Sequence, residues 1–206
     1  MVRSIALSVL GLAIAACGDP NAGALFADIQ YGTECDESRG CTPAPNRDIC
    51  GINLGDPCPE VGGTANLSCS VLEATDGSTR TLTFSASQGT DFSIAIRQAI
   101  IPFAGGPAAG ANCTVTIVDG PNRHTGLCGS SEPTDAQPCQ VSGVRFYDDL
   151  GNPTLEGDIF CQHLQNQANP LQLLEVHAKG SAATDAMSPG HFRIANCDGL
   201  EIPEEG

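Results

Sequence analysis

The sequence predicts an all-β protein whose main domain is an antiparallel β-sandwich of about eight strands. Short runs alternate between apolar and polar residues, which is the period of a strand with one buried face. Asp-Gly pairs at 76–77 and 119–120, which favour tight turns, follow two of these runs. No long stretch has the period of an amphipathic helix, so we expect two sheets packed face to face.

The chain opens with the pattern of a secretory signal peptide. Arg3 supplies a positive charge, and an uncharged apolar run extends from Ile5 to Ala16. A helix of that length would rise only about 18 Å, against about 30 Å for the hydrocarbon core of a bilayer. We therefore expect residues 1–16 to be a signal that is removed, not a membrane span.

The apolar run closes on Ile14-Ala15-Ala16-Cys17, in which two small residues precede a cysteine. This motif resembles the lipobox of bacterial lipoproteins, and the resemblance covers residues 1–17. It implies cleavage before Cys17, a diacylglycerol thioether on its sulfur, and acylation of the new amine, with palmitate as the expected chain. Several acyl chains anchor a protein permanently, because each buried methylene contributes about 0.8 kcal/mol. The alternative is an ordinary signal peptide whose cleavage happens to precede a disulfide cysteine.

The residues after Cys17 bear on the membrane to which the lipid would attach. In enteric lipoproteins, an aspartate directly after the lipidated cysteine marks retention in the inner membrane. Here Gly18 takes that position and Asp19 follows one place later. The resemblance therefore implies a lipid-anchored protein of the cell envelope, in the outer membrane more readily than in the inner one.

The cysteine count agrees with this assignment. The chain has 11 cysteines, an odd number that would leave a free thiol in a secreted protein. Assigning Cys17 to the lipid leaves an even number, and five disulfides are then expected in an oxidising compartment. The candidates are Cys35, Cys41, Cys50, Cys58, Cys69, Cys113, Cys128, Cys139, Cys161 and Cys197.

Composition divides the mature chain into four parts. Residues 17–33 are the expected anchor and flexible tether, because they are mostly small or polar. Residues 34–61 form a proline- and glycine-rich segment with four cysteines, which two local bridges would hold in any of three pairings. Their spacing is not that of a zinc ribbon. The sandwich is expected at 62–199, followed by an acidic tail at 200–206.

The strands of the sandwich are expected at 66–71, 81–86, 92–96, 113–118, 141–147, 155–164, 171–178 and 191–196. A helix over 91–99 is an alternative to the third strand, because Phe92 and Ile96 are also four residues apart. One or two disulfides from Cys113, Cys128 and Cys139 should clamp the turn-rich region 119–140. Jelly-roll and immunoglobulin-like connectivity both remain open, since the chain has no tryptophan to mark the latter.

The charge excludes one class of partner. The formal net charge is −15 and the few basic residues are scattered, so the chain has no footprint for nucleic acid or for anionic lipid headgroups. We find no G-x-S-x-G, H-E-x-x-H, P-loop, EF-hand or C-x-x-C motif. The sequence therefore predicts no catalytic, cofactor or metal residues, and we lean against an enzyme.

Several polar residues have ordinary structural explanations. His124, His163, His177 and His191 lie on different elements, and Glu175, His177 and Lys179 are expected to share a solvated strand face. The acidic run Asp148, Asp149, Asn152, Glu156 and Asp158 suits turn chemistry, with calcium binding as the alternative. Ser130 and Ser131, near Glu132 and Asp135, lack a local base. Asn66-Leu67-Ser68 and Asn112-Cys113-Thr114 match the glycosylation sequon by chance.

These observations predict a lipid-anchored envelope protein of unknown specific function, most simply a non-enzymatic binding or structural module at the surface. Its partners would be the membrane, through the lipid on Cys17, and a protein or glycan ligand. The alternative is a hydrolase or carbohydrate-active module whose site is assembled from separate loops, which a single sequence does not reveal.

Overall fold

The computed structural model describes residues 23–52, 65–90, 92–110, 112–180 and 188–202. Strands dominate these ranges, and the one helical element in them is a short 3₁₀ turn, η1 (Glu37–Arg39). The strands are β1 (Phe26–Cys35), β2 (Ala44–Ile52), β3 (Ala65–Glu73), β4 (Thr79–Gln88), β5 (Phe92–Pro102), β6 (Thr114–Asp119), β7 (Asn122–Gly129), β8 (Cys139–Asp149), β9 (Asn152–Asn166), β10 (Leu173–His177) and β11 (Gly190–Ala195). Across these ranges no helix is long and apolar enough to cross a bilayer.

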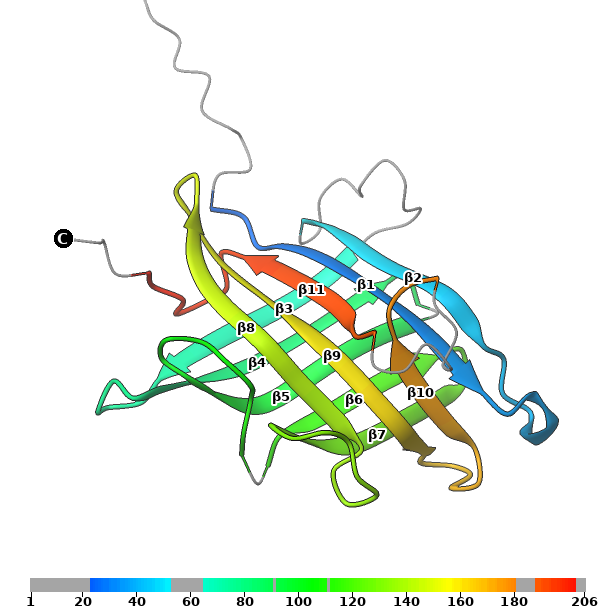
Figure 1. Ribbon diagram of the computed structural model, residues 1–206. Coiled ribbons are helices and arrows are strands. Elements are labelled where there is room, and N and C mark those ends of the chain that lie inside the picture. Colours follow the sequence, from blue (N-terminus) through cyan, green and yellow to red (C-terminus); the bar gives the residue numbers. More distant parts are fainter. Residues whose placement is uncertain (1–22, 53–64, 91, 111, 181–187, 203–206) are drawn as a thin grey trace, which may run out of the picture.

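The strands form one continuous 11-stranded sheet in the order β10-β1-β11-β9-β8-β7-β6-β5-β4-β3, with β2 on the free side of β1. All pairings are antiparallel except a short parallel contact between β7 and β8. Figure 1 shows the sheet folded over on itself, with β1, β8, β9 and β11 in front of β3 to β6. The all-β, antiparallel prediction is confirmed, with more strands than the eight expected and with both layers belonging to a single sheet.

The core lies between the two layers. Alternate residues of each strand are buried, so β4 contributes Leu82 and Phe84 while β11 contributes Phe192 and Ile194. The rings of Phe84 and Phe192 meet across the layers, with centroids 5.4 Å apart. This apolar contact holds the layers face to face, because each large buried side chain contributes about 1.5–3 kcal/mol.

Both Asp-Gly pairs lie at hairpin turns, as their turn chemistry predicts. Gly77 and Gly120 have φ of 67° and 55°, in the left-handed region that glycine adopts without steric cost. Asp76 accepts hydrogen bonds from the backbone N–H and the hydroxyl of Ser78, which fixes the turn between β3 and β4. Residues 92–96 are part of β5, so the strand prediction holds there and the helical alternative is wrong.

Three strands lie where loops were expected. Residues 26–33, predicted as part of the flexible tether, belong to β1, which pairs with β2 on one side and with β10 and β11 on the other. β2 lies within the predicted cysteine-rich segment, and β7 lies within the predicted loop over 119–140. These segments gain their stability from neighbours distant in sequence, which a local pattern does not reveal. Leu200, placed in the tail, is buried against the core.

The described cysteines are all in disulfides. Cys69–Cys197 ties the edge strand β3 to the segment after β11, where Val71 and Asp198 also share a 2.8 Å backbone hydrogen bond. The other pairs are Cys35–Cys41, Cys113–Cys128 and Cys139–Cys161, and Cys50 is also bridged. The second and third of these flank 119–140, as expected for a clamp. Cys17 and Cys58 lie outside the described residues.

We predict that the Cys69–Cys197 and Cys35–Cys41 disulfides contribute unequally to the free energy of unfolding. Cys69 and Cys197 are 128 residues apart and Cys35 and Cys41 only 6. From the loop-closure entropy, we expect the free energy of unfolding to fall by about 5 kcal/mol in the Cys69→Ala/Cys197→Ala variant. In the Cys35→Ala/Cys41→Ala variant it should fall by about 2 kcal/mol. Urea denaturation of the two variants and the parent chain measures the difference, and equal losses would contradict it.

Candidate functional site

The outward side of the layer formed by β3 to β7 is rich in hydroxyl groups. We call it the hydroxyl face and define it by Asn66, Ser68, Ser70, Thr83, Ser85, Ser87, Ser93, Ala95, Arg97, Thr114, Thr116, Val118, Arg123, Thr125 and Leu127. These residues alternate with the buried core positions of the same strands. Strand alternation therefore turns every one of them away from the core.

The strand register arranges the hydroxyl face in rows. One row runs Ser68, Ser85, Ala95, Thr116 and Thr125, as direct partners on successive strands. Neighbouring strands are about 4.8 Å apart, so the hydroxyls form a regular polar grid. Thr116 and Thr125 close one end of the row, with a 3.0 Å hydrogen bond between their hydroxyls.

Two open hollows lie along the hydroxyl face. The larger has a volume of about 660 Å³ and extends from Ser68 on β3 to Leu127 on β7. The smaller, of about 320 Å³, is lined by Asn66, Ser87 and Ser93 and shares Ser68 and Ser85 with the larger. Ser85, Ser87 and Ser93 make no side-chain hydrogen bond to any described residue. Their hydroxyl groups are therefore available to a ligand or to water.

A bulge in β5 shapes the larger hollow. Arg97 and Gln98 together oppose Thr83, and Gln98 adopts a left-handed φ of 54°. The Gln98 N–H donates to the Thr83 hydroxyl at 3.3 Å, which holds the extra residue in place. Both Arg97 and Gln98 are exposed as a result. Bulges often redirect side chains beside binding sites, and this one brings a guanidinium and an amide into the same hollow.

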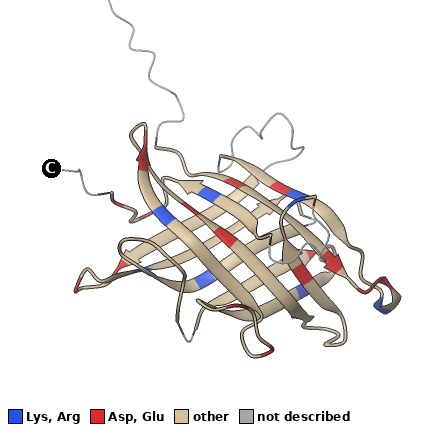
Figure 2. Cartoon of the chain, in the orientation of Figure 1, with Lys and Arg blue, Asp and Glu red and all other residues tan. Residues whose placement is uncertain are grey.

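The hydroxyl face is cationic within an acidic protein. Five basic residues elsewhere pair with carboxylates, namely Arg39, Arg47, Arg145, Lys179 and Arg193. The guanidinium groups of Arg97 and Arg123, in contrast, have no partner among the described residues, and no position of the hydroxyl face is a carboxylate. In Figure 2, most acidic segments lie on the other layer and in loops, while β3 to β6 are largely uncharged.

The geometry suits a hydrated, acceptor-bearing ligand. Serine and threonine hydroxyls both donate and accept hydrogen bonds, and an arginine donates strongly to carboxylate or phosphate oxygens. No exposed aromatic ring lines the larger hollow, because Phe84 lies in its floor with its side chain buried in the core. Recognition at this face would therefore rest on hydrogen bonds and charge, not on stacking.

The carboxylates of the acidic run from 148 to 158 have partners within the protein. Asp149 pairs with Arg193, Glu156 with Arg145, and Asp158 lies 3.2 Å from the His191 ring. Asp148 accepts from the Gly151 N–H, as a turn residue does. No trio of metal-ligating side chains occurs within the described ranges.

The four histidines are dispersed, and two of them are buried. The predicted solvated face of Glu175, His177 and Lys179 is wrong at His177, which is 3 % exposed and donates from Nδ1 to the Ala178 carbonyl at 2.9 Å. Lys179 is exposed and pairs with Asp48. His163 lies 3.9 Å from Glu175 and is exposed.

A buried polar group lies between the layers. Tyr31 on β1 is the direct partner of Arg47 on β2, whose guanidinium pairs with Asp119 on β6. His124 on β7 is 1 % exposed, and both of its ring nitrogens lack a hydrogen-bond partner in the described part of the chain. The Tyr31 hydroxyl is also buried without a partner, and burial raises its pKa well above the ordinary value, so it stays protonated.

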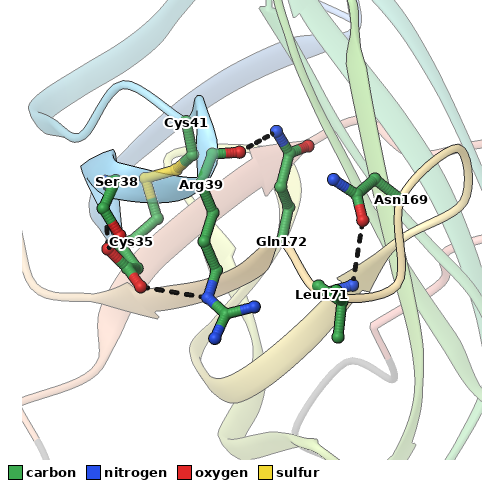
Figure 3. Close-up of polar contacts among 8 residues, drawn as sticks. Cys35, Ser38, Arg39, Cys41, Asn169, Leu171 and Gln172 are labelled. Atoms are coloured by element: carbon green, nitrogen blue, oxygen red, sulfur yellow. Dashed lines mark hydrogen bonds and ion pairs between the residues drawn. A yellow bond between two sulfur atoms is a disulfide. The ribbon is translucent and has the colours of Figure 1, made fainter.

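A smaller cavity near η1 has the opposite charge to the hydroxyl face. Its volume is about 290 Å³, and Glu34, Asp36, His163 and Glu175 line it together with Cys35 and Leu173. Figure 3 shows how the loop beside it is fixed: the Cys35–Cys41 disulfide closes the loop, Arg39 pairs with Asp36, and Gln172 donates to the Arg39 carbonyl. The loop is therefore held by its disulfide, by an internal ion pair and by one contact from Gln172, and Asp36 and Arg39 serve that structural role.

The structure also locates the serines, carboxylates and sequons that the sequence analysis considered. Ser130, Ser131, Glu132 and Asp135 lie exposed in the β7–β8 loop, where no described histidine or carboxylate bonds to either serine. Both sequons contribute to the large hollow, through Ser68 of the first and through Asn112 and Thr114 of the second. The sequence signal for the site is thus the polar half of each strand's alternation.

Comparisons with protein-family models, with curated proteins and with solved structures find no match to this chain.

The buried His124 predicts a dependence of stability on pH. Burial lowers its pKa below the ordinary 6.5, which outweighs the opposing attraction of Asp119. As pH falls below about 6.5, the unfolded chain binds a proton at this ring before the folded protein does, so the free energy of unfolding should decrease. We expect His124→Leu to flatten this decrease between about pH 7 and 5, as measured by urea midpoints. An unchanged slope would show that another group is responsible.

Proposed function

We propose that this protein is a lipid-anchored component of the cell envelope that acts as a non-enzymatic binding module. Its ligand is a glycan that bears carboxylate groups, and the hydroxyl face is the binding surface. The Cys17 lipid holds the domain at the membrane, most readily the outer one, while the hydroxyl face engages the polymer. The domain itself is folded independently of the ligand, through its core and disulfides.

One observation carries the proposal: two unpaired arginines lie on a carboxylate-free grid of hydroxyls, on a chain of net charge −15. In such a protein an exposed arginine finds an acidic neighbour easily, as five of the basic residues do. Arg97 and Arg123 are kept apart from carboxylates and surrounded by groups that bind hydroxyls. This combination matches a hydroxylated polymer with periodic acidic groups.

The shape of the site is consistent with an extended ligand. The two hollows share Ser68 and Ser85 and together cross from β3 to β7. Arg97 and Arg123 lie in the two rows that flank the row from Ser68 to Thr125, since Arg97 aligns with Thr114 while Arg123 aligns with Val118. A polymer lying along the grid would meet one cation in each of these two rows.

We predict that Arg97→Ala and Arg123→Ala each weaken binding to insoluble peptidoglycan, which carries hydroxyl, amide and carboxylate groups. Losing a charge-assisted hydrogen bond costs about 1.5–3 kcal/mol, which corresponds to a roughly 10- to 100-fold lower affinity. Cosedimentation of the chain from Gly18 onward, without the lipid, measures the affinity.

Two controls accompany this measurement. Arg145→Ala removes an equal charge from an exposed position on β8, and it should leave binding unchanged. Chitin offers hydroxyls and amides without carboxylates, and it should bind far more weakly than peptidoglycan. If Arg145→Ala weakened binding as much as Arg97→Ala, net charge and not the hydroxyl face would be the determinant.

A second candidate function is a hydrolase or carbohydrate-active module, favoured by the buried group of Tyr31, Arg47, Asp119 and His124. Proton transfer needs one free ring nitrogen, and both His124 nitrogens lack a partner among the described residues. This candidate predicts that the protein releases soluble products from peptidoglycan and that His124→Gln abolishes the release. Binding without release supports the non-enzymatic module instead.

The anchoring part of the proposal has its own test. Replacing the acceptor sulfur in Cys17→Ala should remove lipidation, so the protein should leave the membrane fraction of cells that express the full chain. Immunoblots of membrane and soluble fractions measure the shift. A variant that stays in the membrane fraction would show that Cys17 is not the anchor.

A further inference from the structure

The turn between β8 and β9 presents the most exposed large apolar side chain of the described residues. Leu150 is 96 % exposed at the tip of this hairpin. Leu150 and Gly151 have φ of 55° and 87°, between the paired residues Asp149 and Asn152. These values are those of a type I′ turn, in which asparagine, aspartate or glycine normally takes the first central position.

Leucine is an unfavourable choice at this position for two reasons. Its branched side chain is disfavoured in the left-handed region, and its apolar surface is left in water. The turn does not depend on the Leu150 side chain, because Asp148 accepts from the Gly151 N–H and the Asn152 amide donates to the Asp149 carbonyl. A residue that breaks two local rules without serving the fold is expected where function requires it.

The base of the same hairpin receives the N-terminal end of the described chain. The Gly23 N–H donates to the Asn152 side chain at 3.4 Å, and Asn196 donates to both Asn152 and the Ala24 carbonyl. Figure 1 shows the start of β1 beside the β8–β9 turn, at one end of the molecule. Leu150 therefore lies at the end of the domain from which the chain leads back to Cys17.

The length of the intervening chain limits how far the anchor can lie from this end. The residues from Cys17 to Gly23 span at most about 20 Å when fully extended. Leu150 is two residues from Asn152, a further reach of about 7 Å. A lipid on Cys17 therefore brings a membrane within the reach of the hairpin tip, whereas Leu171, which is 66 % exposed, follows the far end of β9.

We propose that the β8–β9 turn is a membrane-contact surface, with Leu150 entering the lipid interface beside the Cys17 anchor. This inference rests on the anchoring proposed above. Two charged pairs near the turn, Arg193 with Asp149 and Arg145 with Glu156, are satisfied within the protein. The contact would give the tethered domain a preferred orientation, because a tethered group meets the surface at a high effective concentration.

The absence of tryptophan from the chain makes a direct test possible. Leu150→Trp creates a single fluorescent reporter at the tip, and Leu171→Trp creates a matched reporter in the β9–β10 loop. The mature chain is coupled through Cys17 to maleimide-bearing phosphatidylcholine vesicles, which makes the test independent of cellular lipidation. We expect a blue shift and quenching by brominated lipid for the reporter at 150, and neither effect for the reporter at 171.

The possible outcomes separate the two proposals. Equal, water-like emission from both reporters on vesicle-bound protein would overturn the contact surface and leave the Cys17 anchor standing. Quenching at 150 on vesicles, together with cells in which Cys17→Ala stays membrane-bound, would support the surface and count against the anchor. Leu150→Asn should not lower the melting temperature, since asparagine suits the turn; a large decrease would show that Leu150 serves the fold instead.

Discussion

The two-residue period of the β-strand is the constraint on which the rest of this structure depends. In the layer from β3 to β7, each strand must place every second side chain in the core, where Phe84 meets Phe192. The intervening residues are then held outward at fixed spacings that they do not determine themselves. The rigidity of the hydroxyl face is thus a consequence of the core behind it. Serine and threonine can occupy that grid because packing is supplied entirely from the other side.

Sequence patterns predicted the fold where a strand carries its own signal. β3, β4 and β6 alternate cleanly and end at recognisable turns, and they were found close to their true limits. β1 has the same alternation in Ala27, Ile29 and Tyr31, but small and polar residues precede it and its partners are mostly distant. β2 and β7 are interrupted by proline, glycine or cysteine. Their strand character comes from pairing with neighbours, and pairing is not a local property.

The binding surface was harder to predict than the fold, for a related reason. Each strand contributes only three residues to the hydroxyl face, and none of these sets forms a motif by itself. Ser68 and Thr125 become members of one row only when the register of four strand pairs is known. The bulge that exposes Arg97 and Gln98 depends on that register as well. The charge pattern is equally hard to predict from the sequence. Arg97 and Arg123 are recognised as unpaired only when the structure shows which other basic residues pair with carboxylates.

The place of β1 in the sheet has a consequence for the order of assembly. This strand is the first in the chain order of the described strands, yet its partners β10 and β11 are among the last segments to be made. The edge strand β3 is likewise joined to a late segment of the chain, by a disulfide to Cys197 and a backbone hydrogen bond to Asp198. Contacts of such large sequence separation form slowly and need nearly the whole chain. A nascent chain of this design can complete its sheet only when synthesis is almost finished.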